Sequence, residues 1–187
     1  TGAGQAVALI DSGVDAMHPA FSGAKIVHGP VFSSAWPAGV SGQNTPDDLT
    51  ALGHGTQLAG IIVGQGSSGF ARHVGMAPAA TLYNLKAAYQ TSQNEAWMPG
   101  ADMLAALDYA VLHTPAKIVN ISFSLGLGNG MQGYDGGDTG TILTLMENIV
   151  QNYAIALVTS AAVAPGFASG TPVAPATLRN GIAVGAM

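Results

Sequence analysis

The stretch "AVALIDSGVD", residues 6–15, sets the interpretation of the whole chain. Five apolar residues are followed by Asp11-Ser12-Gly13, which is typical of a buried strand that ends in a polar turn. Similar short apolar runs recur along the sequence and predict further strands. These expected strands are residues 25–27, 81–86, 117–122, 154–159 and 181–185.

Helical patterns lie between these runs. Residues 101–113 and 141–153 have apolar side chains at helical spacing, and a third helix is expected to begin near His54 in "GHGTQLAGIIVG". Strands that alternate with helices form a parallel sheet that is covered on both faces, with right-handed crossovers. We therefore expect an α/β fold, a three-layer sandwich with a mostly parallel sheet, in one domain without internal repeats.

Composition excludes several classes of protein. Hydrophobic residues make up 48% of the 187 residues and charged residues only 8%, which is globular and not disordered. The net charge of -5 is not the basic footprint of nucleic-acid binding. No apolar run reaches the roughly 18 residues needed to span a membrane. Because cysteine is absent, a thiolate nucleophile and a cysteine metal site are excluded.

Two polar residues lie where chemistry is expected in such a fold. In parallel sheets, functional residues gather beyond the carboxyl ends of the strands, where Asp11 lies. His54 lies at the start of a helix between two glycines, which leave room beside the ring. A carboxylate that orients an imidazole is half of a system that activates a nucleophile. Taken singly, Asp11 is as well explained as a turn cap and His54 as a helix cap, but their longer contexts favour chemistry.

These contexts resemble the motifs of the subtilisin-like serine peptidases, whose triad runs in the order Asp, His, Ser. The matching blocks occur in order along essentially the whole chain, and each resembles a motif of that family. They are "VALIDSGVDAMHPAF" (7–21), "GHGTQLAGI" (53–61), "GMAPAATLYNLK" (75–86), "IVNISFSLG" (118–126) and "PATLRNGIAVGAM" (175–187).

The resemblance implies a role for each matching residue. Asp11 is implied as the catalytic aspartate, which holds His54 in one tautomer, and His54 as the general base and then the general acid. The partner implied is a polypeptide substrate in extended conformation, added as a strand. The implied substrate-binding positions are Ser122, Phe123 and Ser124 along the groove, and Ser160, Ala161 and Ala162 at the pocket before the scissile bond.

The chain departs from the family at two catalytic positions. In "SAAVAPG", residues 160–166, Val163 replaces the asparagine that donates to the oxyanion. Loss of such a donor costs roughly 3–4 kcal/mol, a magnitude that comes from subtilisin itself. The nucleophile normally lies in a later Gly-Thr-Ser-x-Ala-x-Pro motif, and the sequence ends at Met187 without one. We therefore expect residues 1–187 to be a partial peptidase domain, inactive on its own.

No metal or cofactor is expected. The family's calcium site is not carried over, because "GQGSSGFARH", residues 64–73, lacks the acidic and asparagine ligands that hard cations need. No pair of histidines has the helical spacing of a zinc site.

Two functions remain open at the level of sequence. The first is an excerpt of a serine endopeptidase, whose Ser comes from a complementary carboxyl-terminal segment or chain. The alternative is a catalytically inactive pseudoprotease that binds peptides or acts as a scaffold, which Val163 favours. A nucleotide-binding domain is disfavoured, because the carboxylates of "DSGVD" (11–15) would repel phosphate. The composition suits a secreted or cell-envelope protein of bacterial type.

Overall fold

A single sheet of six parallel strands organises the structure, a computed structural model. It describes residues 1–50, 53–66, 72–90, 96–123, 139–161 and 174–185. The strand order is β2-β3-β1-β6-β7-β8, and every neighbouring pair is parallel. The strands of this sheet are β1 (Ala6–Asp11), β2 (Lys25–Val31), β3 (Thr81–Lys86), β6 (Ile118–Ile121), β7 (Ala156–Ser160) and β8 (Gly181–Val184).

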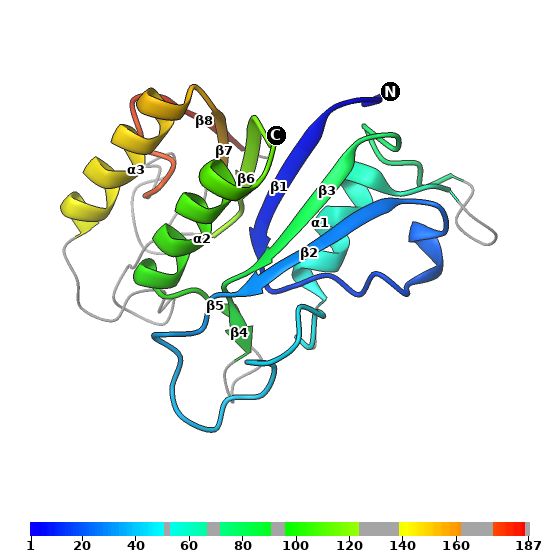
Figure 1. Cartoon of the computed structure of the whole chain (residues 1–187), viewed down its shortest axis with the longest axis horizontal. Coiled ribbons are helices and arrows are strands. Elements are labelled where there is room, and N and C mark those ends of the chain that lie inside the picture. Colours follow the sequence, from blue (N-terminus) through cyan, green and yellow to red (C-terminus); the bar gives the residue numbers. More distant parts are fainter. Residues whose placement is uncertain (51–52, 67–71, 91–95, 124–138, 162–173, 186–187) are drawn as a thin grey trace.

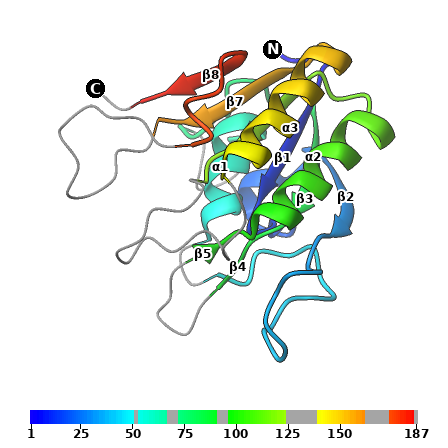
Figure 2. The same ribbon diagram turned by 90° about the vertical axis from the view of Figure 1, so that its left-hand side faces the viewer.

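Helices lie on both faces of this sheet (Figure 1). Helix α1 (His54–Val63) covers one face, and α2 (Gly100–His113) and α3 (Thr139–Tyr153) pack side by side on the other, as the turned view in Figure 2 also shows. The smaller elements are the 3-10 helix η1 (Pro19–Phe21) and an antiparallel pair, β4 (Tyr89–Gln90) and β5 (Ala96–Trp97). The expected three-layer α/β fold with a mostly parallel sheet is therefore confirmed.

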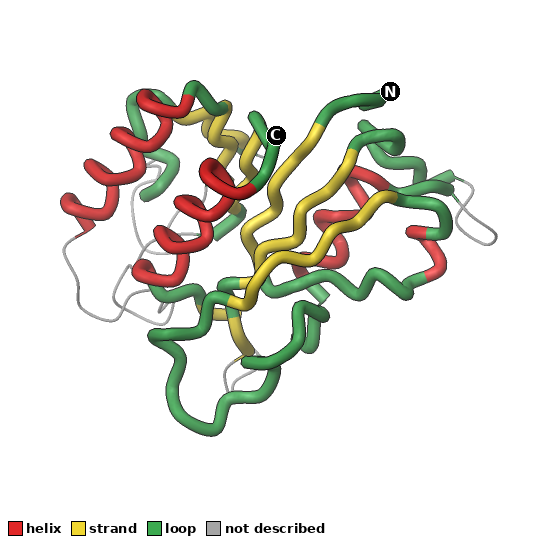
Figure 3. The backbone as a smooth tube through the Cα atoms, in the orientation of Figure 1, coloured by secondary structure: helices red, strands yellow, loops and turns green. Residues whose placement is uncertain are grey.

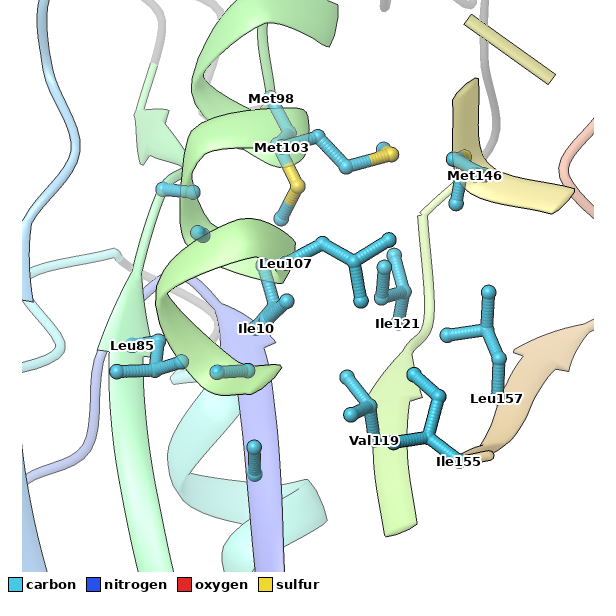
Figure 4. Close-up of a cluster of buried hydrophobic side chains, with 14 of the residues drawn as sticks. Ile10, Leu85, Met98, Met103, Leu107, Val119, Ile121, Met146, Ile155 and Leu157 are labelled. Carbon is cyan, nitrogen blue, oxygen red and sulfur yellow. The ribbon is translucent and has the colours of Figure 1, made fainter. Parts of the chain in front are cut away.

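The main core lies between the sheet and the pair α2 and α3. Alternate residues of neighbouring strands point to the same side, so Ile10 of β1, Ile121 of β6 and Leu157 of β7 all face these helices, each fully buried (Figure 4). Met103 and Leu107 of α2 pack onto them, also at 0% exposure. Full burial of such a side chain contributes about 1.5–3 kcal/mol, so this layer fixes the sheet on which the site is built.

A smaller core lies under α1, on the opposite face. Val7 and Leu9 of β1 pack there against Ala59 and Val63 of the helix. Small side chains let the helix approach the strand closely, which brings the first residue of α1 to the carboxyl end of β1.

Helix α1 does not extend over β6, β7 and β8. On this face Ile118 of β6 is 38% exposed, and Ile182 and Val184 of β8 are 52% and 55% exposed. These side chains lie on the same side of the sheet as Val7 and Leu9, because Val7 pairs with Ile118 in register. An apolar strip of the sheet is thus uncovered.

Two expected strand boundaries are wrong by more than one residue. The edge strand β2 runs to Val31 and not to Val27, with a register irregularity between His28 and Val31. Strand β7 begins at Ala156 and not at Ala154, because Ala154 has a left-handed φ of 50° that ends α3 in a turn. Neither change moves a candidate site residue. In the described part of the chain, no helix is both long and apolar enough to cross a membrane.

Candidate active site

Asp11 is the last residue of β1, in the middle of the sheet. Its side chain is completely buried, and its Oδ1 accepts hydrogen bonds from the backbone N–H of Ser12 at 2.8 Å and from the Ser12 hydroxyl at 3.2 Å. A buried carboxylate is costly unless it is hydrogen-bonded in this way. Asp11 therefore has a fixed position at the carboxyl edge of the sheet, where the sequence places it.

His54 opens helix α1 and faces this carboxylate. The preceding Gly53 has a φ of 58°, a left-handed conformation that glycine adopts without strain. His54 Nδ1 lies 2.8 Å from Asp11 Oδ1, and the histidine side chain is 38% exposed. Since an ionised carboxylate can only accept, the Nδ1 hydrogen donates to Asp11, and Nε2 is left able to accept a proton.

Gly55 allows this close approach. A Cβ at this position would overlap the carbonyl oxygen of Gly13 and lie 3.0 Å from Asp11 Oδ1. The glycine after His54 therefore lets the start of α1 touch the end of β1. From the sequence, the glycines are expected to leave space beside the His54 ring. In the structure, the backbone of Gly13, in the turn after β1, occupies the space beside Gly55.

Each member of the pair shifts the protonation of the other. The hydrogen bond that His54 donates to Asp11 is the main cause that raises the pKa of His54 above its ordinary value, and burial of the ring opposes it. Burial raises the pKa of the Asp11 carboxyl, and the hydrogen bonds from His54 and Ser12 oppose that rise. The arrangement favours an imidazolium paired with a carboxylate, which is the charge distribution that a general base needs when it takes a proton.

We expect the Asp11→Asn variant to lower the pKa of His54. The charged form of His54 loses its main partner while the burial that opposes this form remains, so the titration midpoint of His54 should fall. Because the folded pKa of His54 is raised, its stabilising effect is present below pH 6.5 and is lost as the pH rises through the folded pKa. Ring-nitrogen NMR of the 187-residue chain measures the midpoint.

The matched control is Asp15→Asn, which removes the same charge from the turn after β1. Among the described residues, the Asp15 side chain accepts one hydrogen bond, which the backbone N–H of Met17 donates to Oδ1. The midpoint of His54 should stay within a few tenths of a unit in this variant. An equal drop in both variants would contradict a specific role for Asp11.

The structure brings one implied substrate-binding residue to the pair. The ring of Phe123 lies edge-on to the His54 ring, with centroids 5.3 Å apart. Ser122 follows β6 as Asp11 ends β1, and its hydroxyl accepts from Asn120 Nδ2 at 3.0 Å. The half-buried residues that follow β6 therefore lie beside His54, and the groove along them stays a prediction.

The other implied positions lie further along the same edge or outside the described residues. Ser160 ends β7, and the backbone N–H of Ala161 donates to the Val184 carbonyl at 2.8 Å, so both lie toward β8. Ser124, Ala162 and Val163 fall outside the described residues. In the residues that are described, no group of three or more His, Asp or Glu side chains could hold a metal ion.

Three polar residues that sequence reasoning did not assign also belong to the site. The Ser12 hydroxyl accepts from the backbone N–H of Gly55 at 3.0 Å and lies 3.1 Å from Asp48 Oδ1. Asp48 Oδ2 accepts from the backbone N–H and the hydroxyl of Thr56, each at 3.0 Å. An aspartate shortly before a helix start is a capping signal in the sequence, but Asp48 lies six positions before His54, too far for the usual cap.

Comparison with known proteins identifies the family. The family described as "Subtilase family" matches residues 2–187. The chain is 33% identical over 189 residues to the "Thermophilic serine proteinase" of Bacillus sp. (strain AK1), covering 98% of this chain and 38% of that protein. It is 33% identical over 131 residues to "Mycosin-3" of Mycobacterium tuberculosis (strain ATCC 25618 / H37Rv), covering 65% of this chain and 25% of that protein.

The fold agrees with a solved structure of the same kind. The structure named "Sphericase" superposes with a TM-score of 0.66 at 25% identity, covering 97% of this chain and 53% of that one. The chain thus spans about half or less of the length of the relatives it matches. The match to the family over residues 2–187, the 33% identity to a serine proteinase and the shared architecture lead to one conclusion: the chain belongs to the subtilisin-like serine peptidases, the subtilase family.

Proposed function

We propose that residues 1–187 carry the aspartate and histidine of a serine endopeptidase whose serine lies on another segment or chain. The observation that carries this proposal is the 2.8 Å hydrogen bond between His54 Nδ1 and Asp11 Oδ1 at the carboxyl edge of the sheet. It leaves Nε2 on the more exposed side of the pair, where a serine hydroxyl can give up its proton.

No serine in the sequence fits the role of nucleophile. None of them lies in a Gly-Thr-Ser-x-Ala-x-Pro motif. Ser12, the serine next to Asp11, is engaged with Asp11, Asp48 and Gly55, so its hydroxyl is fixed away from Nε2. The pair can therefore orient and accept a proton, but without a nucleophile it forms no acyl-enzyme.

The uncovered strip of the sheet supports a complementary segment. Ile118, Ile182 and Val184 are exposed apolar side chains on the face that holds α1. In an α/β sandwich, such a face is covered by helices, because the hydrophobic effect disfavours leaving it in water. A Ser-bearing segment that packs on β6, β7 and β8 would cover this strip and reach the carboxyl edge beside His54.

The substrate proposed is a polypeptide in extended conformation. Ser122 and Phe123 would present the end of β6 to it, with Ser124 beyond them, and Ser160, Ala161 and Ala162 would line the pocket for the side chain before the scissile bond. Bacterial relatives are consistent with a secreted or cell-envelope location, which we include in the proposal.

Val163 favours a second function. If this residue occupies the oxyanion position, its side chain offers no hydrogen-bond donor, and a protein under no demand for turnover could tolerate that loss. The alternative is a pseudoprotease that binds extended peptides along the same edge. One residue outside residues 1–187 distinguishes the two functions. It is the serine of the Gly-Thr-Ser-x-Ala-x-Pro motif, which the peptidase requires and the pseudoprotease does not.

The test begins with the coding sequence that flanks the region for residues 1–187. An intact Gly-Thr-Ser-x-Ala-x-Pro motif supports the peptidase, and a motif with the serine replaced supports the pseudoprotease. Purified residues 1–187 should show no reaction with a fluorophosphonate probe and no cleavage of an unfolded protein substrate. The complete protein should show both. Robust, inhibitor-sensitive cleavage by residues 1–187 alone would overturn the proposal.

A further inference from the structure

The loop before α1 contains a carboxylate with an unusual number of donors. Asp48 lies within hydrogen-bond distance of five donor groups. Two from Thr56 reach Oδ2, and two from Thr50 and one from Ser12 reach Oδ1. The shortest is the Thr50 hydroxyl at 2.6 Å. The single hydrogen of the Ser12 hydroxyl is shared between Asp48 Oδ1 at 3.1 Å and Asp11 Oδ1 at 3.2 Å. Each donor comes from a different part of the site: Ser12 from the end of β1, Thr50 from the loop itself, and Thr56 from the first turn of α1.

These donors lie next to the catalytic pair in the chain. Ser12 follows Asp11 directly, and Thr56 lies two residues after His54. Because the same carboxylate contacts both residues, Asp48 joins the end of β1 to the start of α1. Gly53, at the N-cap, provides no side-chain cap, so Asp48 also supplies the acceptor that the first turn of α1 needs.

The loop that carries Asp48 follows β2 in the chain (Figure 3), and hydrogen bonds fix this loop to the sheet. Lys86 Nζ, at the end of β3, donates to the carbonyl of Asp47 at 2.6 Å and to that of Thr45 at 3.1 Å. Asn84 Nδ2 donates to the Pro46 carbonyl at 2.9 Å, and the backbone N–H of Val14 donates to the same oxygen at 3.2 Å. Asp48 is therefore anchored to β1 and β3, and it transmits their position to α1.

We propose that Asp48 is a positioning residue of the active site, which sets the approach of His54 to Asp11 by bonding Ser12 and Thr56. Its described hydrogen bonds go to residues beside the catalytic pair and not to Asp11 or His54 themselves. Asp48 acts through the hydrogen bond between Asp11 and His54. Its effect on turnover rests on the proposed function, whereas its effect on the geometry of this hydrogen bond does not.

Electrostatics adds to this role. The charged groups around the cluster are Asp11 from β1, Asp47 and Asp48 from the loop, Lys86 from β3 and His54 from α1. The Asp48 carboxylate helps to raise the pKa of His54, in addition to Asp11, and both Asp48 and Asp47 oppose the lowering of the Lys86 pKa by burial. A neutral residue at position 48 thus weakens both the geometry and the charge that favour the imidazolium.

The test compares Asp48→Asn with Asp47→Asn in the 187-residue chain. An asparagine has one oxygen and one NH₂ group, so one half of the cluster meets a donor in place of an acceptor. Asp47 is exposed and accepts only from its neighbour Thr45 among the described side chains, so its variant removes the same charge without touching the cluster. The readout is exchange with water of the His54 Nδ1 hydrogen, together with the titration midpoint of His54.

We expect the Nδ1 hydrogen to exchange at least tenfold faster in Asp48→Asn and the midpoint to fall, with both unchanged in Asp47→Asn. If Asp48→Asn does not fold, Thr56→Val is tested in its place. It removes one donor to the Asp48 carboxylate with little change in shape, and it also removes the acceptor of the Asp15 backbone N–H. That variant should also speed exchange several-fold. Exchange at the wild-type rate in whichever variant folds overturns the proposal.

The complete protein gives a second, independent readout. If it is a peptidase, Asp48→Asn should lower kcat tenfold or more with KM changed less than twofold, as expected for a change in geometry at the reacting groups. If the complete protein has no peptidase activity, the proposed peptidase function is contradicted. The exchange rate of the His54 Nδ1 hydrogen then tests the role of Asp48 by itself. An active complete protein in which Asp48→Asn is silent contradicts this inference alone.

Discussion

Replacing His54 by alanine in the complete protein should lower kcat by about 10⁶, the scale that subtilisin itself sets for a triad that acts as a unit. His54 Nε2 is the group that would take the serine proton, and no other described side chain is bonded to Asp11 except that of Ser12. Replacing Asp11 by alanine should cost less, about 10⁴, because Asp11 orients the ring and stabilises its charge but transfers no proton. Steady-state kinetics on a peptide substrate measures both losses.

The control removes a histidine at a distance. His113 ends α2, on the other face of the sheet, and is exposed. His113→Ala should keep kcat within about twofold. A His54→Ala variant that retained more than one per cent of the wild-type rate would show that another group acts as the base, and the assignment of His54 would fail.

The order of the elements could be predicted because each depends on its own residues. Short apolar runs such as residues 6–10, bounded by turn residues, are typical of buried strands in a sheet covered on both faces. Their alternation with helices favours parallel pairing. The end of β2 was not predictable in this way. Gly29 and Pro30 indicate a turn, but β2 is an edge strand, where a proline removes no hydrogen bond from the sheet.

The residues of the candidate site also differ in whether the sequence could predict them. Asp11 and His54 lie in contiguous motifs whose residues carry the signal, so both could be found from sequence and the structure places them in contact. Asp48 could not be assigned, because its hydrogen bond to Ser12 joins residues 36 positions apart, and only the folded chain brings them together. Long-range polar contacts leave no periodic pattern in the sequence, and the positioning groups of a site are usually of this kind.

Gly55→Ala should destabilise the chain by about 2–3 kcal/mol, the cost of inserting a methyl group into a closely packed region. The new Cβ would lie 3.0 Å from Asp11 Oδ1 and 3.2 Å from Asp11 Cβ, and it would overlap the Gly13 carbonyl, so α1 must move away from β1. Urea unfolding of the 187-residue chain measures the free energy of unfolding, with the slope as a check that the two states are unchanged.

The same helix provides the matched control for this substitution. Gly60 lies one and a half turns further along α1, and a Cβ there would meet nothing within 4 Å. Gly60→Ala should therefore stabilise the chain by about 0.5–1 kcal/mol, since alanine is the better helix former. Both substitutions gain the higher helix propensity of alanine. They differ only in the atoms that the new Cβ contacts. The gap of about 3 kcal/mol between the variants then measures the contact between α1 and β1, and equal stabilities would mean that Asp11 and His54 do not depend on Gly55 to meet.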